Sequence, residues 1–206
     1  MTATHRAVPA SDLSSRDAYF MLIDTVVPRP IAWTTTVGRD GVPNLAPFSF
    51  FMGVTGRPPT IAVSIAPKVV RHPDGTRDIE VKHTLANLRA TGELIVHVAP
   101  APLRDRVVAS AAALPRSEGE LHDLGFTDVV PGTWVDAPRL AELPVALECR
   151  VDRIVPVGNP ATHLVLAEVL GWHVREDLLV DGRVPSAGFH PLARLGIESY
   201  GTVTPE

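Results

Sequence analysis

Residues 145–174 constrain the fold most, because their pattern predicts a long antiparallel β hairpin. Residues 145–157 alternate apolar and polar side chains, and the apolar positions are Val145, Leu147, Cys149 and Val151. Residues 162–174 return with a similar pattern, and Asn159-Pro160 lies in the turn between the two segments. A period of two is typical of a strand with one buried face, and a short connection favours antiparallel pairing.

The spacing of turn residues also favours short strands over a helical bundle, since the chain holds 20 prolines and 15 glycines. Further strands are predicted at residues 31–37, 44–51, 60–66 and 93–98, and the proline at position 47 predicts an edge or an irregular strand. Helices are predicted from Ser14 or Ser15 to before Pro28, at 84–90 and at 103–114, and loops at 67–81 and 115–143. The expected fold is mainly β with short helices: about six or seven antiparallel strands in a Greek-key barrel. No GxGxxG follows a strand, which argues against a Rossmann site.

Length and charge narrow the class of protein. The 206 residues are expected to form one domain, 1–206, with residues 1–14 as a flexible arm. A net charge of −4 argues against a nucleic-acid binder. No apolar run reaches the roughly 20 residues that a membrane span needs, and the first residues lack the apolar core of a secretory signal. We therefore expect a cytoplasmic protein that does not enter a membrane.

The sequence gives little support for catalysis by side chains without a cofactor. The sequence has no HExxH, GxSxG or CxxC pattern, so no metal site is expected. Cys149, the only cysteine, alternates with Leu147 and Val151, which favours a packed core thiol over a Cys–His catalytic pair. A bound cofactor is the better candidate for carrying the chemistry.

Thr34, Thr35 and Thr36, followed across a turn by Asn44–Phe50, form the first candidate binding segment. Hydroxyl and amide groups alternate there with apolar side chains, and Pro47 interrupts the strand. An interrupted strand leaves backbone N–H and C=O groups unpaired. Those groups could face the edge of a planar heterocycle such as a flavin. The alternative is an ordinary hairpin with Thr and Ser facing water.

Lys82-His83-Thr84, leading to Asn87, form the second candidate segment. A helix that begins there presents unpaired N–H groups and the positive end of its dipole, which attract phosphate. The alternative is a simple capped helix with a solvated lysine.

Arg29 and Arg194 lie in proline-flanked apolar segments and suit either phosphate contacts or surface salt bridges. Six aromatic side chains could stack on a ring, although most of them are expected in the core: Trp33, Trp134, Trp172, Phe48, Phe50 and Phe51.

In this order, the segments resemble the flavin-reductase-like, FMN-binding split β-barrel family of flavin reductases and flavoredoxins. The matching segments are 28–36, 44–50, Ser64, 82–87, 143–149 and 191–196 with Tyr200. Together they extend over nearly the whole chain, from about residue 15 to 201. Family members commonly carry Lys-Asp-Thr where this chain has Lys82-His83-Thr84. The histidine keeps phosphate binding plausible but changes its expected geometry.

The resemblance implies a homodimer with FMN, rather than FAD, near the subunit interface. It implies that Thr34–Thr36 and the 44–49 segment border the flavin ring and that Lys82 and Thr84 hold the phosphate. Arg194 and Tyr200 serve either their own pocket or that of the partner subunit. The cofactor-binding residues expected are Thr34, Thr35, Thr36, Asn44, Ala46, Pro47, Phe48, Ser49, Ser64, Lys82, His83, Thr84, Asn87 and Arg194.

The implied activity is that of an NAD(P)H-dependent flavin reductase, which passes electrons through FMN to a partner monooxygenase or another acceptor. Such an enzyme needs a pocket that stacks nicotinamide on flavin rather than an acid–base residue, so no catalytic residue is assigned. No motif selects NADH over NADPH. Three alternatives stay open: an FMN electron carrier without a nicotinamide site, an FMN enzyme acting on a specialised small molecule, and a flavin-free barrel. Residues 67–81 could border the substrate entrance.

Overall fold

A seven-stranded sheet dominates the computed structural model, which describes residues 4–112, 120–185 and 188–202. Its strands lie in the order β3-β2-β8-β11-β12-β5-β4, and each neighbouring pair is antiparallel. The strands are β2 (Ala32–Val37), β3 (Pro43–Phe48), β4 (Phe51–Gly56), β5 (Pro59–Ile65), β8 (Glu93–His97), β11 (Val145–Val157) and β12 (Thr162–Val174). The expectation of a mainly β, antiparallel fold is confirmed.

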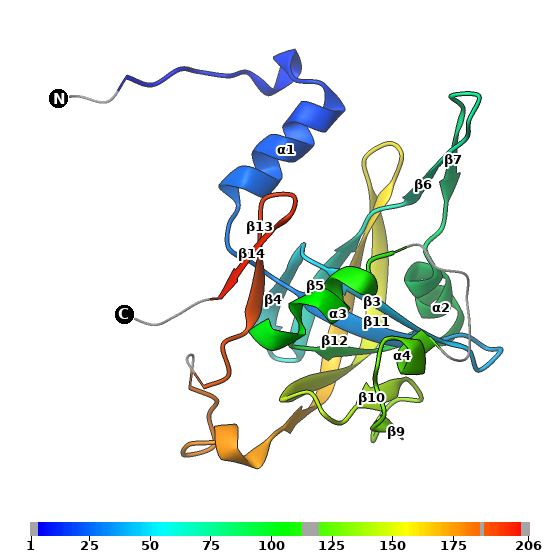
Figure 1. Cartoon of the computed structure of the whole chain (residues 1–206), viewed down its shortest axis with the longest axis vertical. Coiled ribbons are helices and arrows are strands. Elements are labelled where there is room, and N and C mark those ends of the chain that lie inside the picture. Colours follow the sequence, from blue (N-terminus) through cyan, green and yellow to red (C-terminus); the bar gives the residue numbers. More distant parts are fainter. Residues whose placement is uncertain (1–3, 113–119, 186–187, 203–206) are drawn as a thin grey trace.

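The β11–β12 hairpin has the predicted bounds and forms the middle of the sheet (Figure 1). Its register shifts between Glu148 and Cys149 and again between Val151 and Arg153. Such bulges bend and twist a strand pair, which curves the sheet around its core. Cys149 of β11 and Val165 of β12 pack in that core with Leu85 and Leu88 of helix α2 (His83–Thr91).

Among the described residues, the sheet has two edges, β3 and β4, and hydrogen bonding does not close it into a complete barrel. Pro47 lies in the edge strand β3, as its missing N–H requires. Three small sheets complete the β structure: β1 (Arg29–Pro30) with β13 (Leu192–Leu195) and β14 (Ser199–Thr202), β6 (Lys68–Arg71) with β7 (Arg77–Glu80), and β9 (Val129–Pro131) with β10 (Pro138–Leu140).

The helices are short: α1 (Ser15–Thr25), α2 (His83–Thr91), α3 (Arg104–Ala109) and α4 (Glu120–Asp123). Ser14 caps α1 as expected, its hydroxyl accepting the N–H of Asp17. Gly92 ends α2 with a left-handed φ of 74°. The predicted helix at 103–114 is shorter than expected, and its residues 113–114 lie outside the described residues.

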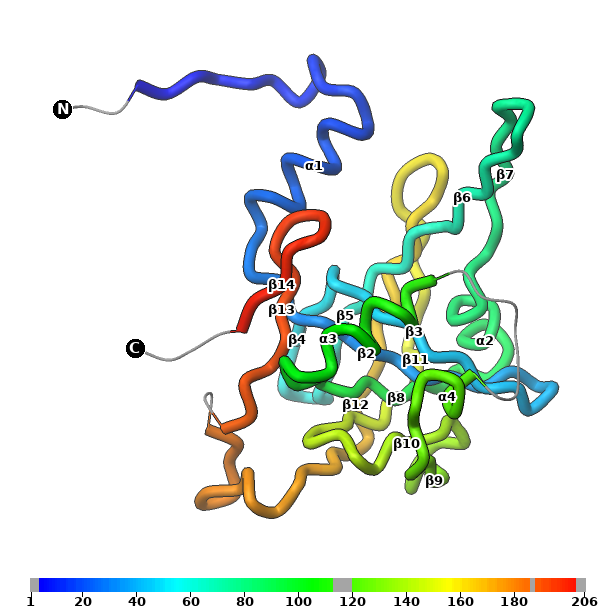
Figure 2. Tube along the Cα trace, in the orientation of Figure 1, coloured from blue at the N-terminus to red at the C-terminus, as the bar shows by residue number. Residues whose placement is uncertain are grey.

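Two segments project from the body of the molecule, namely α1 and the β6–β7 hairpin (Figures 1 and 2). Residues 67–81 therefore form a hairpin and not the predicted loop. Its strands escaped prediction because they bury no face: β7 is fully exposed, and β6 alternates half-buried and exposed residues. Across the hairpin, Lys68 pairs with Glu80, and His72 with Asp78. The 115–143 loop likewise contains α4, β9 and β10, with 115–119 outside the described residues.

The aromatic residues are less buried than expected. Trp33 and Phe48 lie in the core and Phe51 is half-buried, but Trp134, Trp172 and Phe50 are 44%, 49% and 37% exposed. The apolar character of one aromatic side chain does not show whether it points into the core or toward solvent.

A buried carboxylate, Glu148, fastens the β9–β10 region to β11. It accepts backbone N–H groups of Thr133 and Trp134 at 2.6–2.9 Å and contacts His173 Nε2 at 2.6 Å. Although burial opposes its charge, these hydrogen bonds hold the pKa of Glu148 below its usual range. Gly132 is required beside it, because a Cβ there would lie 2.3 Å from the Val135 carbonyl oxygen.

His97 joins three strands in the interior. Its Nε2 accepts the Leu140 N–H at 3.0 Å, so Nδ1 carries the proton and donates to the Trp33 carbonyl at 3.1 Å. Burial lowers the pKa of His97 from 6.5 to about 4.

The free energy of unfolding should therefore fall as the pH drops from about 6.5 to about 4. Between these values the unfolded chain binds a proton at His97 and the folded chain does not, a difference of up to about 3 kcal/mol. Urea unfolding at pH 7 and pH 5 measures the loss. His97→Gln, which retains a donor and an acceptor, should reduce the pH dependence; an unchanged pH dependence would contradict this role of His97.

Candidate functional site

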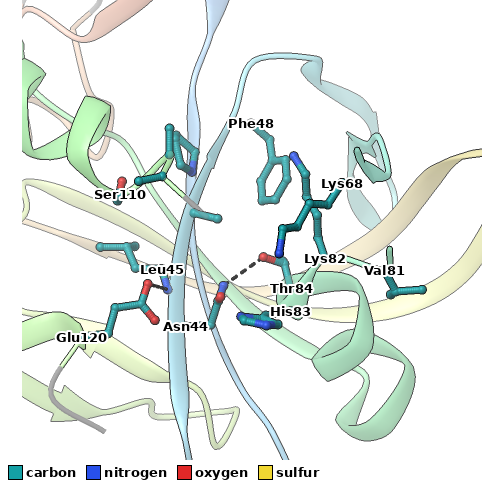
Figure 3. Close-up of a pocket in the computed structure, with 14 residues that line it drawn as sticks. Asn44, Leu45, Phe48, Lys68, Val81, Lys82, His83, Thr84, Ser110 and Glu120 are labelled. Atoms are coloured by element: carbon teal, nitrogen blue, oxygen red, sulfur yellow. Dashed lines mark hydrogen bonds between the residues drawn. The ribbon is translucent and has the colours of Figure 1, made fainter. Parts of the chain in front are cut away.

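A pocket of about 230 Å³ lies between the edge strand β3, the first turn of α2, the end of α3 and α4 (Figure 3). It is lined by Asn44, Leu45, Ala46, Pro47, Phe48, Lys68, Val81, Lys82, His83, Thr84, Ser110, Ala111, Ala112 and Glu120. One wall is therefore an open strand edge, and the opposite end is the start of a helix.

Two buried side-chain hydrogen bonds fix α2 against the β2–β3 hairpin. Asn44 Nδ2 donates to Thr84 Oγ1 at 2.9 Å, and Asn87 Nδ2 donates to Thr36 Oγ1 at 3.1 Å. All four side chains are buried. Because a buried amide without a partner costs about 1–3 kcal/mol, these contacts set the position of the helix relative to the strand.

The α2 end of the pocket is positively charged. Lys82 is the N-cap residue, but its side chain makes no capping hydrogen bond, and helix geometry leaves the N–H groups of the first turn without intrahelical acceptors. Its Nζ lies 5.5 Å from the centre of the Phe48 ring, and it forms no ion pair within the described part of the chain. Burial lowers the pKa of Lys82. Lys68 reaches the same end from β6.

The other end of the pocket carries Glu120 and Ser110. Glu120 Oε1 accepts the Leu45 N–H on the open edge of β3, at 3.4 Å. Ser110 Oγ accepts the Trp33 indole N–H at 2.8 Å and donates to the Val107 carbonyl at 2.9 Å. Between the two ends, Leu45, Ala46, Pro47 and Phe48 give the pocket an apolar wall. The arrangement suits an elongated ligand with an anionic tail and a flat, largely apolar body.

Seven of the predicted binding residues lie together in this pocket: Asn44, Ala46, Pro47, Phe48, Lys82, His83 and Thr84. The other predicted residues do not line it: Thr34, Thr35, Thr36, Ser49, Ser64, Asn87 and Arg194. Thr35 donates its hydroxyl to the Pro138 carbonyl at 2.6 Å, Thr34 bonds the Ala32 carbonyl at 3.3 Å, and Ser64 N–H bonds the Phe50 carbonyl at 2.8 Å. Whether these residues contact a cofactor stays a prediction.

Arg29 and Arg194 face each other across β1 and β13, outside the pocket. Arg29 is buried and donates to the carbonyls of Ile23 and Gly196, both at 2.7 Å. Arg194 hydrogen-bonds the hydroxyl of Tyr200. Arg29 thus connects α1 to the β13–β14 turn, a structural contact that the sequence did not indicate.

Seven lining residues were not on the expected list, and the three polar ones among them are Lys68, Ser110 and Glu120. Each comes from a segment that lacks a recognisable motif, and the fold alone brings it to the pocket. For Lys68 one signal exists in the sequence, because Lys68 and Lys82 are the only lysines of the chain.

Other chemistries find little support. Cys149 is buried as expected, and burial raises the pKa of its thiol to about 12. The described residues contain no group of three or more His, Cys, Asp or Glu side chains placed to hold a metal ion. Within the same residues, no helix is long and apolar enough to span a membrane.

Comparison with known proteins decides the family. The sequence model of the flavin reductase-like domain matches residues 24–188, most of the chain. The chain belongs to the flavin reductase-like family. An uncharacterized protein of Halalkalibacterium halodurans is 38% identical over 193 residues, covering 92% of this chain and 88% of that protein.

Solved structures support a split-barrel fold. A protein with a split barrel domain from Shewanella frigidimarina has a TM-score of 0.77 and 18% identity, covering 95% of this chain and 92% of its own. Nitrilotriacetate monooxygenase component B of Bacillus cereus has a TM-score of 0.88 and 29% identity, covering 100% of this chain and 98% of its own. The 2-nitrobenzoate 2-nitroreductase NbaA of Pseudomonas fluorescens has a TM-score of 0.81 and 28% identity, covering 98% and 93%.

The charged and hydrogen-bonding groups that line the pocket fit a flavin. Two ammonium groups and the first turn of α2 match an anionic phosphate, and the exposed edge of β3 beside an apolar wall matches a ring with polar atoms on its rim.

Removing the charge of Lys82 should weaken the binding of FMN. A charged phosphate contact contributes about 1.5–3 kcal/mol, so Lys82→Met is expected to raise the Kd at least about tenfold. Equilibrium titration of the apoprotein measures the change. Arg89→Met, which removes an exposed cation from the same helix outside the pocket, is the matched control. Equal affinities for both variants would contradict the placement of the phosphate.

Proposed function

We propose that this protein is an FMN-dependent oxidoreductase that accepts electrons from NADH or NADPH and passes them to an acceptor. The observation that carries the proposal is the pocket itself, with two lysines and a helix N-terminus at one end and an open strand edge along its side. Family membership supports the flavin, and the two lysines at one end of the pocket support a phosphate group such as that of FMN.

The chain's part in this function is to bind and orient. Lys82 and the first turn of α2 hold the phosphate, and Asn44 keeps that turn in place through Thr84. Phe48 and Pro47 exclude water from one side of the ring. When bound, the flavin supplies hydride and electron transfer. Under this division of labour the pocket needs no acid–base residue, so no catalytic role is assigned to Glu120 or His83.

The proposal for the electron acceptor draws on two of the similar solved structures. One is a component of a monooxygenase, which supports transfer of reduced flavin or electrons to a partner monooxygenase. The other is a nitroreductase, which supports the second candidate, an FMN enzyme that reduces a small molecule in its own pocket. We also propose a single domain over residues 1–206 and a cytoplasmic location, as the sequence predicts.

Anaerobic addition of NADH or NADPH should bleach the flavin absorbance of the FMN-loaded protein. Stopped-flow spectrophotometry with each nucleotide measures the reaction, and free FMN at the same concentration is the control. Absorbance that persists with both nucleotides would exclude the reductase and favour an electron carrier. Failure to retain FMN at all would exclude every flavin-based candidate.

We also propose a homodimer, on the basis of α1. Ile23 is the only buried residue of this helix, whereas Tyr19, Met21 and Leu22 are 51%, 46% and 54% exposed. Val26 and Val27 continue the apolar surface beyond its end. A twofold arrangement would cover this surface in both copies at once, which makes a second copy the natural occupant.

Leu22→Lys should therefore shift the protein from dimer to monomer, because it places a charge in the apolar contact. Sedimentation velocity over a range of concentrations measures the change. Leu179→Lys is the control, since Leu179 is 43% exposed but lies away from α1 in the sequence and beyond β12. A monomeric unsubstituted protein would contradict the proposal.

A further inference from the structure

The two lysines of the chain converge on one site. All other side chains among the 19 basic Lys and Arg residues are arginines, yet Lys68 and Lys82 both line the α2 end of the pocket. Figure 3 shows the two side chains on the Thr84 side of the pocket, away from Glu120. The two compact ammonium groups of the chain therefore lie at the same end of one pocket, while its other Lys or Arg positions all carry arginine. An ammonium binds phosphate as a point charge with three donors, whereas a guanidinium needs space for a planar fork.

The two lysines differ in their surroundings. Lys82 is half-buried beside Phe48 and forms no ion pair within the described residues. Lys68 Nζ lies 3.0 Å from Glu80 Oε2, its cross-strand partner in the β6–β7 hairpin. The Lys68 and Glu80 side chains are 34% and 49% exposed. A partly exposed ion pair contributes little to stability, so Lys68 can change partner at small cost.

We propose that Lys68 is a second phosphate ligand, which exchanges Glu80 for the terminal phosphate of FMN when the cofactor binds. The inference rests on the proposed function and adds to it a residue that selects the phosphorylated flavin. A phosphate monoester carries a charge of about −1.5 to −2 near neutral pH, so it outcompetes the single charge of Glu80 for the ammonium. Riboflavin has the same ring and no phosphate, and it leaves the Lys68–Glu80 pair intact.

This exchange would also connect the β6–β7 hairpin to the cofactor. The hairpin projects from the body of the molecule, and within the described part of the chain its strands pair only with each other. Lys68 is its first residue and lies at the pocket. Binding of phosphate at Lys68 would therefore anchor the base of the hairpin next to α2.

Affinities for FMN and riboflavin test the role of Lys68. Lys68→Met should raise the Kd for FMN about tenfold and leave that for riboflavin within about twofold. Arg71→Met removes a cation from the same strand outside the pocket and should change neither. An unchanged ratio of the two affinities in Lys68→Met would overturn the inference and leave the proposed function standing. Absence of binding of both flavins to the unsubstituted protein would overturn both.

Glu80 competes with the phosphate for Lys68, so its substitution should have the opposite effect on FMN affinity. Glu80→Gln should tighten FMN binding by up to about fivefold, because Lys68 no longer has to leave an ion pair. Asp78→Asn is the matched control, since Asp78 pairs with His72 on the same hairpin. Weaker FMN binding by Glu80→Gln than by the control would overturn the exchange.

Chemical labelling of the unsubstituted protein gives a readout that needs neither activity nor substitution. Reductive methylation modifies lysine amines, and peptide mapping by mass spectrometry assigns the two side chains separately. FMN should slow methylation of Lys68 several-fold, and saturating riboflavin should not. Equal protection of Lys68 by both flavins, or by neither, would overturn the inference.

Discussion

The hydrogen bonds from Asn44 to Thr84 and from Asn87 to Thr36 place the first turn of α2 beside an open strand edge, and the pocket depends on that placement. A shift of α2 along the sheet would leave two buried amides without partners, at about 1–3 kcal/mol each. The helix dipole and Lys82 are therefore held at one position next to β3. The same contacts occupy the Asn44 amide N–H and the Thr36 hydroxyl, so both side chains help to position the helix.

The open edge of the sheet supplies the rest of the site. Among the strands that the structure describes, β3 has a neighbour on one side only, so its outer backbone groups can contact a ligand. At Leu45, one of these groups donates to Glu120. Behind this edge, interior strands are joined by hydrogen bonds. His97, for example, bonds the Trp33 carbonyl and the Leu140 N–H. A sheet edge that lies open beside the start of a helix suits a protein that binds a cofactor and leaves the chemistry to it.

The long β11–β12 hairpin was predictable to the residue because its alternation repeats over many positions and a turn separates its strands. The start of α2 and the cap of α1 were predictable because capping is a local effect. The β6–β7 hairpin was not, since its strands bury no face and so show no apolar alternation in the sequence. Nor did the sequence show that Trp134 and Trp172 would remain exposed.

By itself the sequence predicted a mainly β chain, two candidate binding segments (34–36 with 44–50, and 82–87), and the family they resemble. These features arise from local periodicity, turn chemistry and helix ends, which neighbouring residues encode. Only the tertiary structure decided that Lys68, Ser110 and Glu120 share the pocket and that Arg194 lies outside it. Such contacts join segments that are distant in the chain, and they depend on how a curved sheet brings its edge, helices and hairpins together.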